Sequence, residues 1–251
     1  MSSSLRVLIA GESWVTHSIH QKGFDSFTTT AYYEGVGPLR DALESKAVSV
    51  EYMPNHVAAT AFPETAEALG AYDVVMLSDI GTNTLLLHPD TFERSVPKPD
   101  RLAAIRDYTA GGGGLVMVGG YLTFQGIDGK ARYAGSPGEE ALPVALHGTD
   151  DRVVAPAGAR PHVVAGDHPI VAGLASDWPA LLGYNRVVTK PGADLVVGVG
   201  EDPLIVAGTF GRGRSVAFTS DCGPHWCPPP FVSWEGYATM WDNLVRWAAG
   251  D

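Results

Sequence analysis

Positive charge, cysteine and long apolar segments are all scarce in this chain. The 17 lysines and arginines are outnumbered by 28 acidic residues, which gives a formal net charge of −11, and they form no basic cluster. Nucleic acids and anionic membranes bind basic patches, so we expect neither as a partner. No apolar run approaches the roughly 20 residues of a membrane span, and the N-terminus lacks the apolar region of a secretion signal. We therefore expect a cytoplasmic protein.

The two cysteines, Cys222 and Cys227, lie five residues apart in a segment rich in proline and glycine. A disulfide between them is one alternative, but free thiols are favoured in a cytosolic chain. Hydrophobic residues make up 45% of the chain and charged residues 18%, which is typical of a globular protein with a large core. One domain over residues 1–251 is the most economical interpretation.

Short apolar strands alternate with helical segments in the first half of the chain. Strands are predicted at 6–11, 48–53, 72–79 and 115–118, and helices at 37–46, 64–69 and 99–110. This order predicts an α/β fold with a mainly parallel sheet of six or seven strands. Segments 6–10, 73–77 and 115–118 are expected to be central, because their apolar, β-branched runs suit burial on both faces.

The pattern changes after residue 126. Residues 129–148 are expected to be irregular, and 153–155 and 162–164 to be short β-like pieces. Three further strands are predicted at 195–199, 203–207 and 215–219, with a hairpin turn at 211–214. Residues 237–249 form an amphipathic pattern that predicts a C-terminal helix.

The strand at 115–118 is bounded by glycines on both sides. Glycines after a buried strand allow a sharp turn at the edge of the sheet where open α/β folds bind their ligands. Many hydrolases place a nucleophilic Ser or Cys on that turn, but here Gly119-Gly120 leads to Tyr121. The chain therefore has the sequence of a nucleophile elbow without a usual nucleophile.

Residues 12–33 are too polar for a core segment and too aromatic for a linker, which predicts a functional loop. Glu12 and His17 are acid/base candidates there. His17 and His20 could instead bind a metal together with His225, or they could be polar loop residues that hydrogen-bond to the backbone.

A second dense cluster, Asp221-Cys222-Gly223-Pro224-His225-Trp226-Cys227, follows a predicted strand. It should lie at the same sheet edge as Asp79 and Tyr121. A rigid proline loop, a pocket lined by Asp221 and His225, and a Cys227 nucleophile paired with His225 are the three interpretations that the residues leave open.

Three motifs in the second half resemble the class I glutamine amidotransferase-like superfamily. They are Asp-His-Pro-Ile-Val-Ala-Gly-Leu at 167–174, Pro-Leu-Ile-Val-Ala at 203–207 and Phe-Gly-Arg-Gly-Arg-Ser-Val-Ala-Phe-Thr-Ser-Asp at 210–221. The resemblance covers nearly the whole chain, is greatest to a group of cytoplasmic "putative glutamine amidotransferase" proteins, and extends distantly to ThuA-like proteins. It implies a flavodoxin-like three-layer sandwich.

The resemblance also implies where a glutaminase triad would lie. The elbow cysteine position falls on or beside Tyr121, the base on His225, and the acid on Cys227. Since two of the three triad members are absent, the thioester mechanism of a glutaminase is not expected.

Our main hypothesis is a pocket at the carboxyl edge of the sheet that binds a small polar metabolite, for which a carbohydrate derivative is one candidate. Its chemistry would be acid/base or metal-assisted, with a divalent metal as the one cofactor considered and His17, His20 and His225 as candidate ligands. The catalytic candidates are Glu12, His17, Asp79, Tyr121 and His225. The candidate binding residues are Trp14, Phe24, Tyr33, Gly120, Phe124, Asp221 and Trp226.

The rival hypothesis is a non-catalytic binding or oligomerisation module. Exposed aromatic residues would then serve a subunit contact, and under either hypothesis we expect a homo-oligomer.

Overall fold

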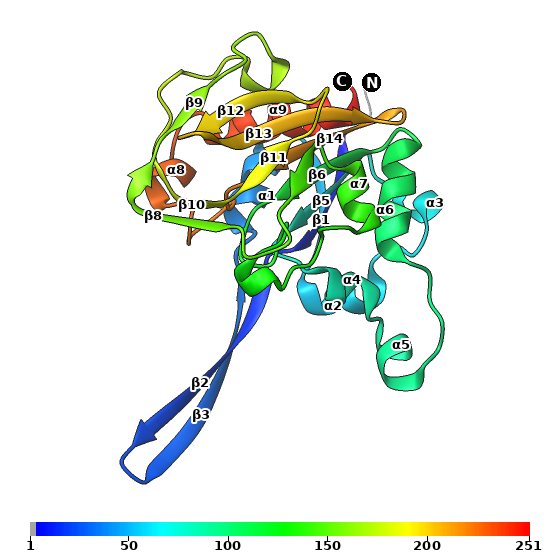
Figure 1. Ribbon diagram of the computed structural model, residues 1–251, viewed down its shortest axis with the longest axis vertical. Coiled ribbons are helices and arrows are strands. Elements are labelled where there is room, and N and C mark those ends of the chain that lie inside the picture. Colours follow the sequence, from blue (N-terminus) through cyan, green and yellow to red (C-terminus); the bar gives the residue numbers. More distant parts are fainter. Residues whose placement is uncertain (1–3) are drawn as a thin grey trace.

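The computed structural model describes residues 4–251 and has an α/β architecture built on one large sheet (Figure 1). Its eight strands lie in the order β4 (Ser49–Met53), β1 (Arg6–Gly11), β5 (Val74–Ser78), β6 (Gly114–Val118), β14 (Gly213–Phe218), β13 (Asp202–Phe210), β12 (Asp194–Val199) and β9 (Pro161–Val163). Neighbours from β4 to β14 are parallel, and those from β14 to β9 are antiparallel. The mainly parallel sheet is confirmed, as is the internal position of β1, β5 and β6, but the sheet is larger than the six or seven strands predicted.

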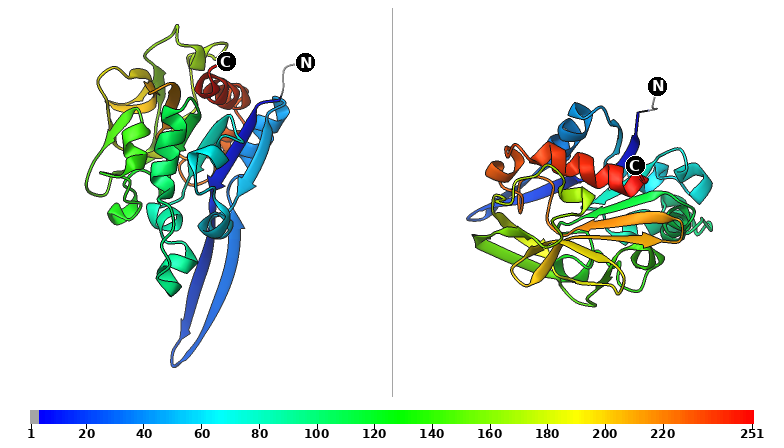
Figure 2. Two further views of the ribbon diagram at one scale, coloured as in Figure 1. Left: turned by 90° about the vertical axis from the view of Figure 1, so that its right-hand side faces the viewer. Right: turned by 90° about the horizontal axis from the view of Figure 1, so that it is seen from above.

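Successive residues of the central strands enter two separate cores, which explains why these strands are apolar throughout. Val7 and Ile9 of β1 belong to one core, and Leu8 and Ala10 belong to the other. The first core is covered by α1 (Gly37–Ser45) and α9 (Tyr237–Ala249), and Phe231 of the short helix that precedes α9 is also buried in it. The second core is covered by α2 (Asn55–Ala61), α3 (Ala66–Leu69), α4 (Thr82–Leu86), α6 (Arg101–Ala110) and α7 (Pro137–Ala141). The three-layer sandwich is visible in Figure 2.

Smaller elements complete the fold. The short helices α5 (Pro89–Arg94) and α8 (Pro229–Val232) and the 3₁₀ turns Ile127–Gly129 and Pro169–Val171 lie in connections. Two antiparallel pairs join β8 (Arg152–Ala159) to β10 (Leu181–Asn185), and β7 (Val144–Leu146) to β11 (Val187–Thr189). The prediction of an irregular segment at 129–148 is wrong, because it contains α7 and β7. The predicted strands at 195–199, 203–207 and 215–219 are confirmed as β12, β13 and β14.

A long hairpin, which we call the arm, projects from the body of the molecule (Figure 1). It consists of β2 (Ser13–Lys22) and β3 (Asp25–Glu34), which pair along their full length from Ser13↔Glu34 to Lys22↔Asp25. The prediction that residues 12–33 form a loop is therefore wrong. The arm has no buried face along most of its length, so the alternation of apolar and polar residues that marks a half-buried strand is absent.

Within residues 4–251, no helix is long and apolar enough to cross a membrane. Residues 1–3, the start of the segment in which we looked for a secretion signal, lie outside the described residues.

Candidate functional site

The strand order brings four polar segments to one edge of the sheet. β1, β5, β6 and β14 are consecutive parallel neighbours, so the residues that follow them emerge side by side. Glu12 follows β1, Asp79 follows β5, the elbow at Gly119–Tyr121 follows β6, and Asp221 lies three residues after the end of β14. This is the edge at which open α/β sheets bind ligands.

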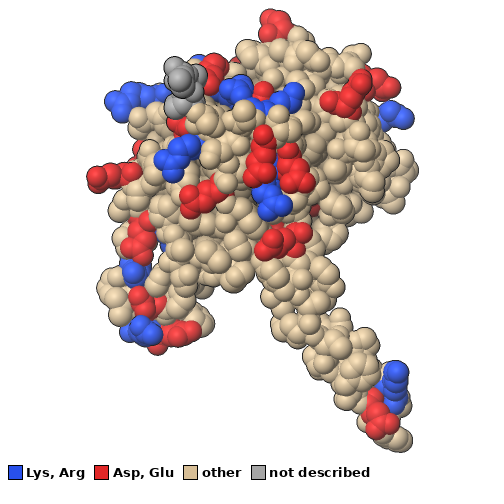
Figure 3. Space-filling view, turned by 180° about the vertical axis from the view of Figure 1, so that it is seen from behind, with Lys and Arg blue, Asp and Glu red and all other residues tan. Residues whose placement is uncertain are grey.

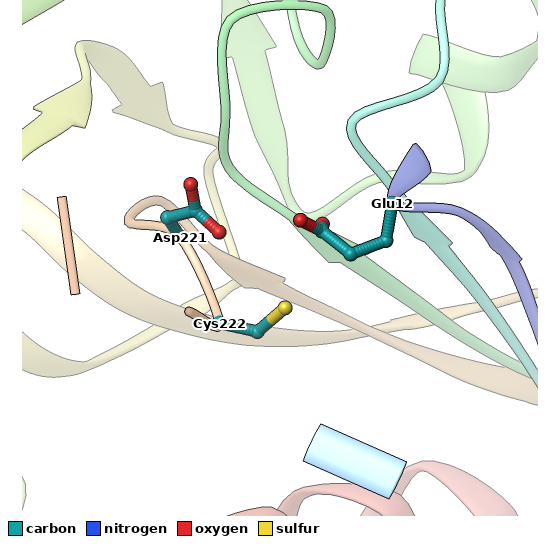
Figure 4. A group of neighbouring side chains, drawn as sticks. All are labelled: Glu12, Asp221 and Cys222. Carbon is teal, nitrogen blue, oxygen red and sulfur yellow. The ribbon is translucent and has the colours of Figure 1, made fainter. Parts of the chain in front are cut away.

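Glu12, Asp221 and Cys222 form a buried cluster below this edge, and their side chains point toward one another (Figure 4). One polar atom from each lies within 4.8 Å of the others. The Ser78 hydroxyl donates a hydrogen bond of 2.5 Å to Glu12 Oε2 and lies 3.7 Å from Cys222 Sγ. Glu12 and Asp221 are only 3% and 4% exposed, so their charges are poorly solvated.

Burial controls the protonation of these acids. It raises the pKa of Glu12 to about 7, with a further contribution from the negative charge of Asp79, and outweighs the hydrogen bond from Ser78. Burial also raises the pKa of Asp221 well above its usual value, and the charges of Glu12 and Asp79 add to this effect. The cluster therefore holds protons at a pH where isolated carboxyl groups have lost them.

The backbone is strained where it presents these side chains. Glu12 and Asp79 have left-handed φ angles of 47° and 44°, and His225 has a φ of 137°. Gly11, at φ +113°, allows β1 to pass close to β5, because a Cβ there would lie 1.8 Å from the Ser78 carbonyl oxygen. The Glu12 N–H donates to that same carbonyl at 2.7 Å, which fixes the acid over the strand end.

The elbow has the expected position, but its backbone amides are occupied. In hydrolases of related architecture, the N–H of the residue after the nucleophile stabilises the oxyanion. Here the Leu122 N–H donates to Asp79 Oδ1 at 2.7 Å. The Gly120 N–H donates to Asn185 Oδ1 at 3.0 Å, and Asn185 Nδ2 donates to the Gly120 carbonyl at 3.2 Å. The elbow is thus held by side chains of the protein itself.

A cavity of about 330 Å³ opens above the elbow and the carboxylates. It is lined by Trp14, Asp79, Tyr121, Leu122, Ile127, Asp221 and His225. The His225 ring lies 5.5 Å from that of Trp14 and stacks on that of Tyr121 at 6.0 Å. A depression of equal volume, lined by Asp73, Asp107 and Gly111 to Gly113 among others, lies at the opposite ends of β5 and β6. Open α/β sheets bind their ligands at the edge where the parallel strands end, so the first cavity is the better candidate for the ligand site.

Several predicted site residues do meet at this edge. Trp14, Asp79, Tyr121, Asp221 and His225 line the cavity, and Glu12 lies in the cluster with Asp221. Trp226 is buried and packs edge-on against the Tyr121 ring at 5.5 Å, so it supports the wall of the cavity. Their proposed roles in binding and catalysis stay predictions.

Other predicted residues lie elsewhere, and for these the sequence interpretation is corrected. His17, His20 and Phe24 are on the arm, where Phe24 is fully exposed. His17 and His20 are three residues apart on a strand and so point to opposite faces, which rules out the shared metal site that a helix would allow. They contact Thr30 and Thr29 at 3.0 and 3.1 Å.

Three more residues do not face the cavity. Phe124 is fully buried in the second core, and Gly120 is buried with both its backbone groups bound to Asn185. Tyr33 is half-exposed at the root of the arm, with its ring 5.9 Å from that of Trp14. Only the first residues of segment 12–33 therefore meet the segment that begins at Asp221.

Both cysteines are free and buried. Burial raises the pKa of the Cys222 thiol, with further contributions from the charges of Glu12 and Asp221. Burial and the charge of Asp221 also raise the pKa of Cys227. A thiol that stays protonated is a poor nucleophile, so the raised pKa values disfavour both cysteines as replacements for the missing elbow residue.

The sequence interpretation missed Asn185 and Asp151. Asn185 Nδ2 donates to Asp151 Oδ1 at 2.8 Å, and Asp151 accepts hydrogen bonds from the N–H groups of Gln125 and Gly126 at 2.9 Å each. Together they hold the turn after β6. Asp151 precedes a strand and Asn185 ends one, and no spacing in the sequence connects either residue to the elbow.

The glycine elbow on a parallel sheet defines a fold of the class I glutamine amidotransferase type. The chain belongs to the family described as "Putative glutamine amidotransferase", whose model matches residues 6–249. No curated protein matches it.

Among solved structures, two proteins from Salmonella typhimurium are similar over the full length. Cytoplasmic Protein STM3548 is 44% identical with a TM-score of 0.95, and Cytoplasmic Protein STM1381 is 46% identical with a TM-score of 0.94. Each match covers 97% of this chain and 99% of the other. A putative ThuA-like protein from Parabacteroides merdae shares the fold at 12% identity, with a TM-score of 0.61 over 98% of this chain and 90% of the other. The predicted resemblance is confirmed.

Proposed function

We propose that this protein binds a small polar metabolite, with carbohydrate derivatives among the candidates, and performs acid/base chemistry on it without a cysteine nucleophile. The observation that carries the proposal is the convergence of Glu12, Asp79 and Asp221 at an aromatic-walled cavity. A cavity of about 330 Å³ lies in the size range of small-molecule sites. We further propose that residues 1–251 act as one domain in the cytoplasm, as the names of the Salmonella relatives suggest.

The proposed chemistry follows from the protonation of the acids. A pKa near 7 lets a carboxyl group give and accept protons at neutral pH, which is the requirement for a general acid/base. Asp79, Asp221 and His225 face the cavity and would contact the ligand, and Glu12 lies close enough to Asp221 to exchange a proton with it through one bridging water. Metal-assisted chemistry through Glu12, Asp221 and Cys222 is the variant that metal analysis would test.

The test is a thermal-shift screen of sugars, sugar acids, amino acids and lactams at neutral pH. A ligand that binds the native cavity should raise the unfolding midpoint of the wild type. The same ligand should have little effect on Asp221→Asn, whereas the exposed control Asp167→Asn should respond like the wild type. If every ligand that stabilises the wild type stabilises Asp221→Asn equally, the cavity is not the binding site and the proposal fails.

The arm favours a second function, assembly with another copy of the chain. Its exposed apolar residues are Val15, Ile19, Phe24, Phe27, Tyr32 and Tyr33, and an isolated two-stranded ribbon is marginally stable in water. Ten residue pairs make a ribbon about 34 Å long. The surface area of its two faces together approaches the roughly 800 Å² that each partner buries in a stable interface.

The low charge of the arm supports a second copy of the chain as the partner. The arm carries Lys22 and Asp25 near its tip and Glu34 at its root, and Figure 3 shows an almost uncharged surface between them. The whole chain carries −11, so contact through the arm joins two acidic molecules with little repulsion.

Light scattering on the full chain and on a chain with residues 16–31 replaced by Asn-Gly tests this assembly. We expect an oligomer for the former and a monomer for the latter. The same oligomeric state for both chains would contradict the proposed assembly.

A further inference from the structure

The cavity described above is lined by two carboxyl groups, Asp79 and Asp221, that have no strongly basic neighbour in its wall. Among the described residues that line it, His225 is the one base, and there is no lysine or arginine. Arg152 lies 5.6 Å from the centre of the Tyr121 ring, but it is bound to Asp150 at 2.6 Å. Asp79 and Asp221 therefore share the cavity, with Glu12 close to Asp221, and without a strong positive partner.

Asp221 presents its carboxyl group to the cavity. The residue is 4% exposed, and its Oδ1 accepts a hydrogen bond from the Gly223 N–H at 3.2 Å. Its Oδ2 is 3.9 Å from His225 Nδ1, which is too long for a hydrogen bond. Because Asp221 lines the cavity, a donor placed there could reach its carboxyl group.

The walls strengthen the attraction for a cation. Trp14, Tyr121, Leu122 and Ile127 line the cavity with largely apolar surface. Charge attraction grows where such surface excludes water, so a positive group next to Asp79 and Asp221 would be held more strongly than on the open surface.

An organic cation fits these features better than a metal ion. Glu12 Oε2 is already occupied by the Ser78 hydroxyl at 2.5 Å. Cys222, the third member of the cluster, keeps its proton because burial raises the pKa of its thiol, and a protonated thiol is a poor metal ligand. The volume of about 330 Å³ accommodates a small organic molecule rather than a single ion.

We infer that the cavity takes a small polar metabolite that carries a primary ammonium group, such as an amino sugar, with Asp221 Oδ2 and Asp79 as the anionic partners of that group. The inference rests on the proposed function, because it assumes that this cavity is the ligand site. The positive charge of the ammonium group would lower the pKa of Asp221, so that the carboxyl group releases its proton to solvent and accepts a hydrogen bond from the amine. The carbon skeleton of the ligand would lie along Trp14 and Tyr121.

Matched pairs of probes that differ in charge test the inference. D-glucosamine is compared with D-glucose and N-acetyl-D-glucosamine, and ethanolamine with ethylene glycol, by calorimetry and thermal shift at neutral pH. The charged member of each set should bind about tenfold tighter or more than the neutral members. Asp221→Asn should remove this preference, and the exposed control Asp167→Asn should keep it.

Three outcomes would overturn the inference. If neutral sugars bind as well as the amines, the ligand class is wrong although the proposed function stands. If Mg²⁺, Mn²⁺ or Zn²⁺ stabilises the protein and the amines do not, the carboxylates form a metal site. If neither the amines nor any compound of the wider screen stabilises the protein, the proposed function fails together with the inference.

Discussion

Replacing Glu12 by glutamine should make the protein more stable at alkaline pH. Glu12 is 3% exposed and its pKa is raised from 4.5 to about 7, chiefly by burial. Glutamine has nearly the same shape, and its carbonyl oxygen can still accept the hydrogen bond that Ser78 donates to Glu12. The substitution thus removes the buried charge and leaves the packing in place.

The sign and size of the effect follow from proton binding. Between about pH 4.5 and 7 the folded protein holds a proton on Glu12 that the unfolded chain has released. The free energy of unfolding of the wild type should therefore fall as the pH rises through this window, and the full cost is present above pH 7. The change in pKa corresponds to about 3 kcal/mol.

Urea unfolding at about pH 5, 6, 7 and 8 measures this cost. Wild type and Glu12→Gln should have similar stability near pH 5, and the variant should be more stable by up to about 3 kcal/mol near pH 8. The variant keeps the fall due to Asp79 and Asp221, whose pKa values are also raised by burial, so the difference between the two proteins isolates Glu12. Glu201→Gln, an exposed control, should follow the wild type. A wild type whose stability is constant or rises from pH 5 to 8 would refute the reasoning.

Three further substitutions test the geometry of the sheet edge. Gly11→Ala should lower the free energy of unfolding in urea by at least about 2 kcal/mol, because of its φ of +113° and the clash with β5, whereas Gly37→Ala, which meets no atom within 4 Å, should be nearly neutral. Asn185→Ala leaves both Gly120 backbone groups unpaired, so we expect a loss of about 2–4 kcal/mol in the same assay, and a loss below 1 kcal/mol would show that the elbow is held by other contacts. Wild type and Tyr121→Cys should release no ammonia from glutamine above background in a coupled assay, since Asp79 occupies the Leu122 amide, and measurable release by either would contradict this assignment.

The sheet could be predicted because its strands are buried on both faces. Residues 7–10, 74–77 and 115–118 are apolar without interruption, and only internal strands of a parallel sheet require that. The arm could not be predicted in the same way. Its strands have no buried face along most of their length, so its residues show neither a continuous apolar run nor a strict alternation.

The part of the site that directly follows the strands could be predicted from the sequence. Asp79, Tyr121 and Asp221 follow strands closely, so their meeting at one edge depends on strand order alone. His17 and His20 were misplaced because their meeting depended on a local conformation, a helix or a folded-over loop, that the segment does not adopt. Asn185 reaches the elbow through long-range pairing that leaves no pattern in one sequence.

The hydrogen bond from the Leu122 N–H to the Asp79 carboxylate limits which single substitutions could give this chain glutaminase activity. A cysteine at residue 121 alone would face an amide that is already occupied. Removing Asp79 alone would leave that amide without its partner and bring no new activity. We therefore expect neither change alone to give glutaminase activity, so selection acting on one substitution at a time would find no favourable first step.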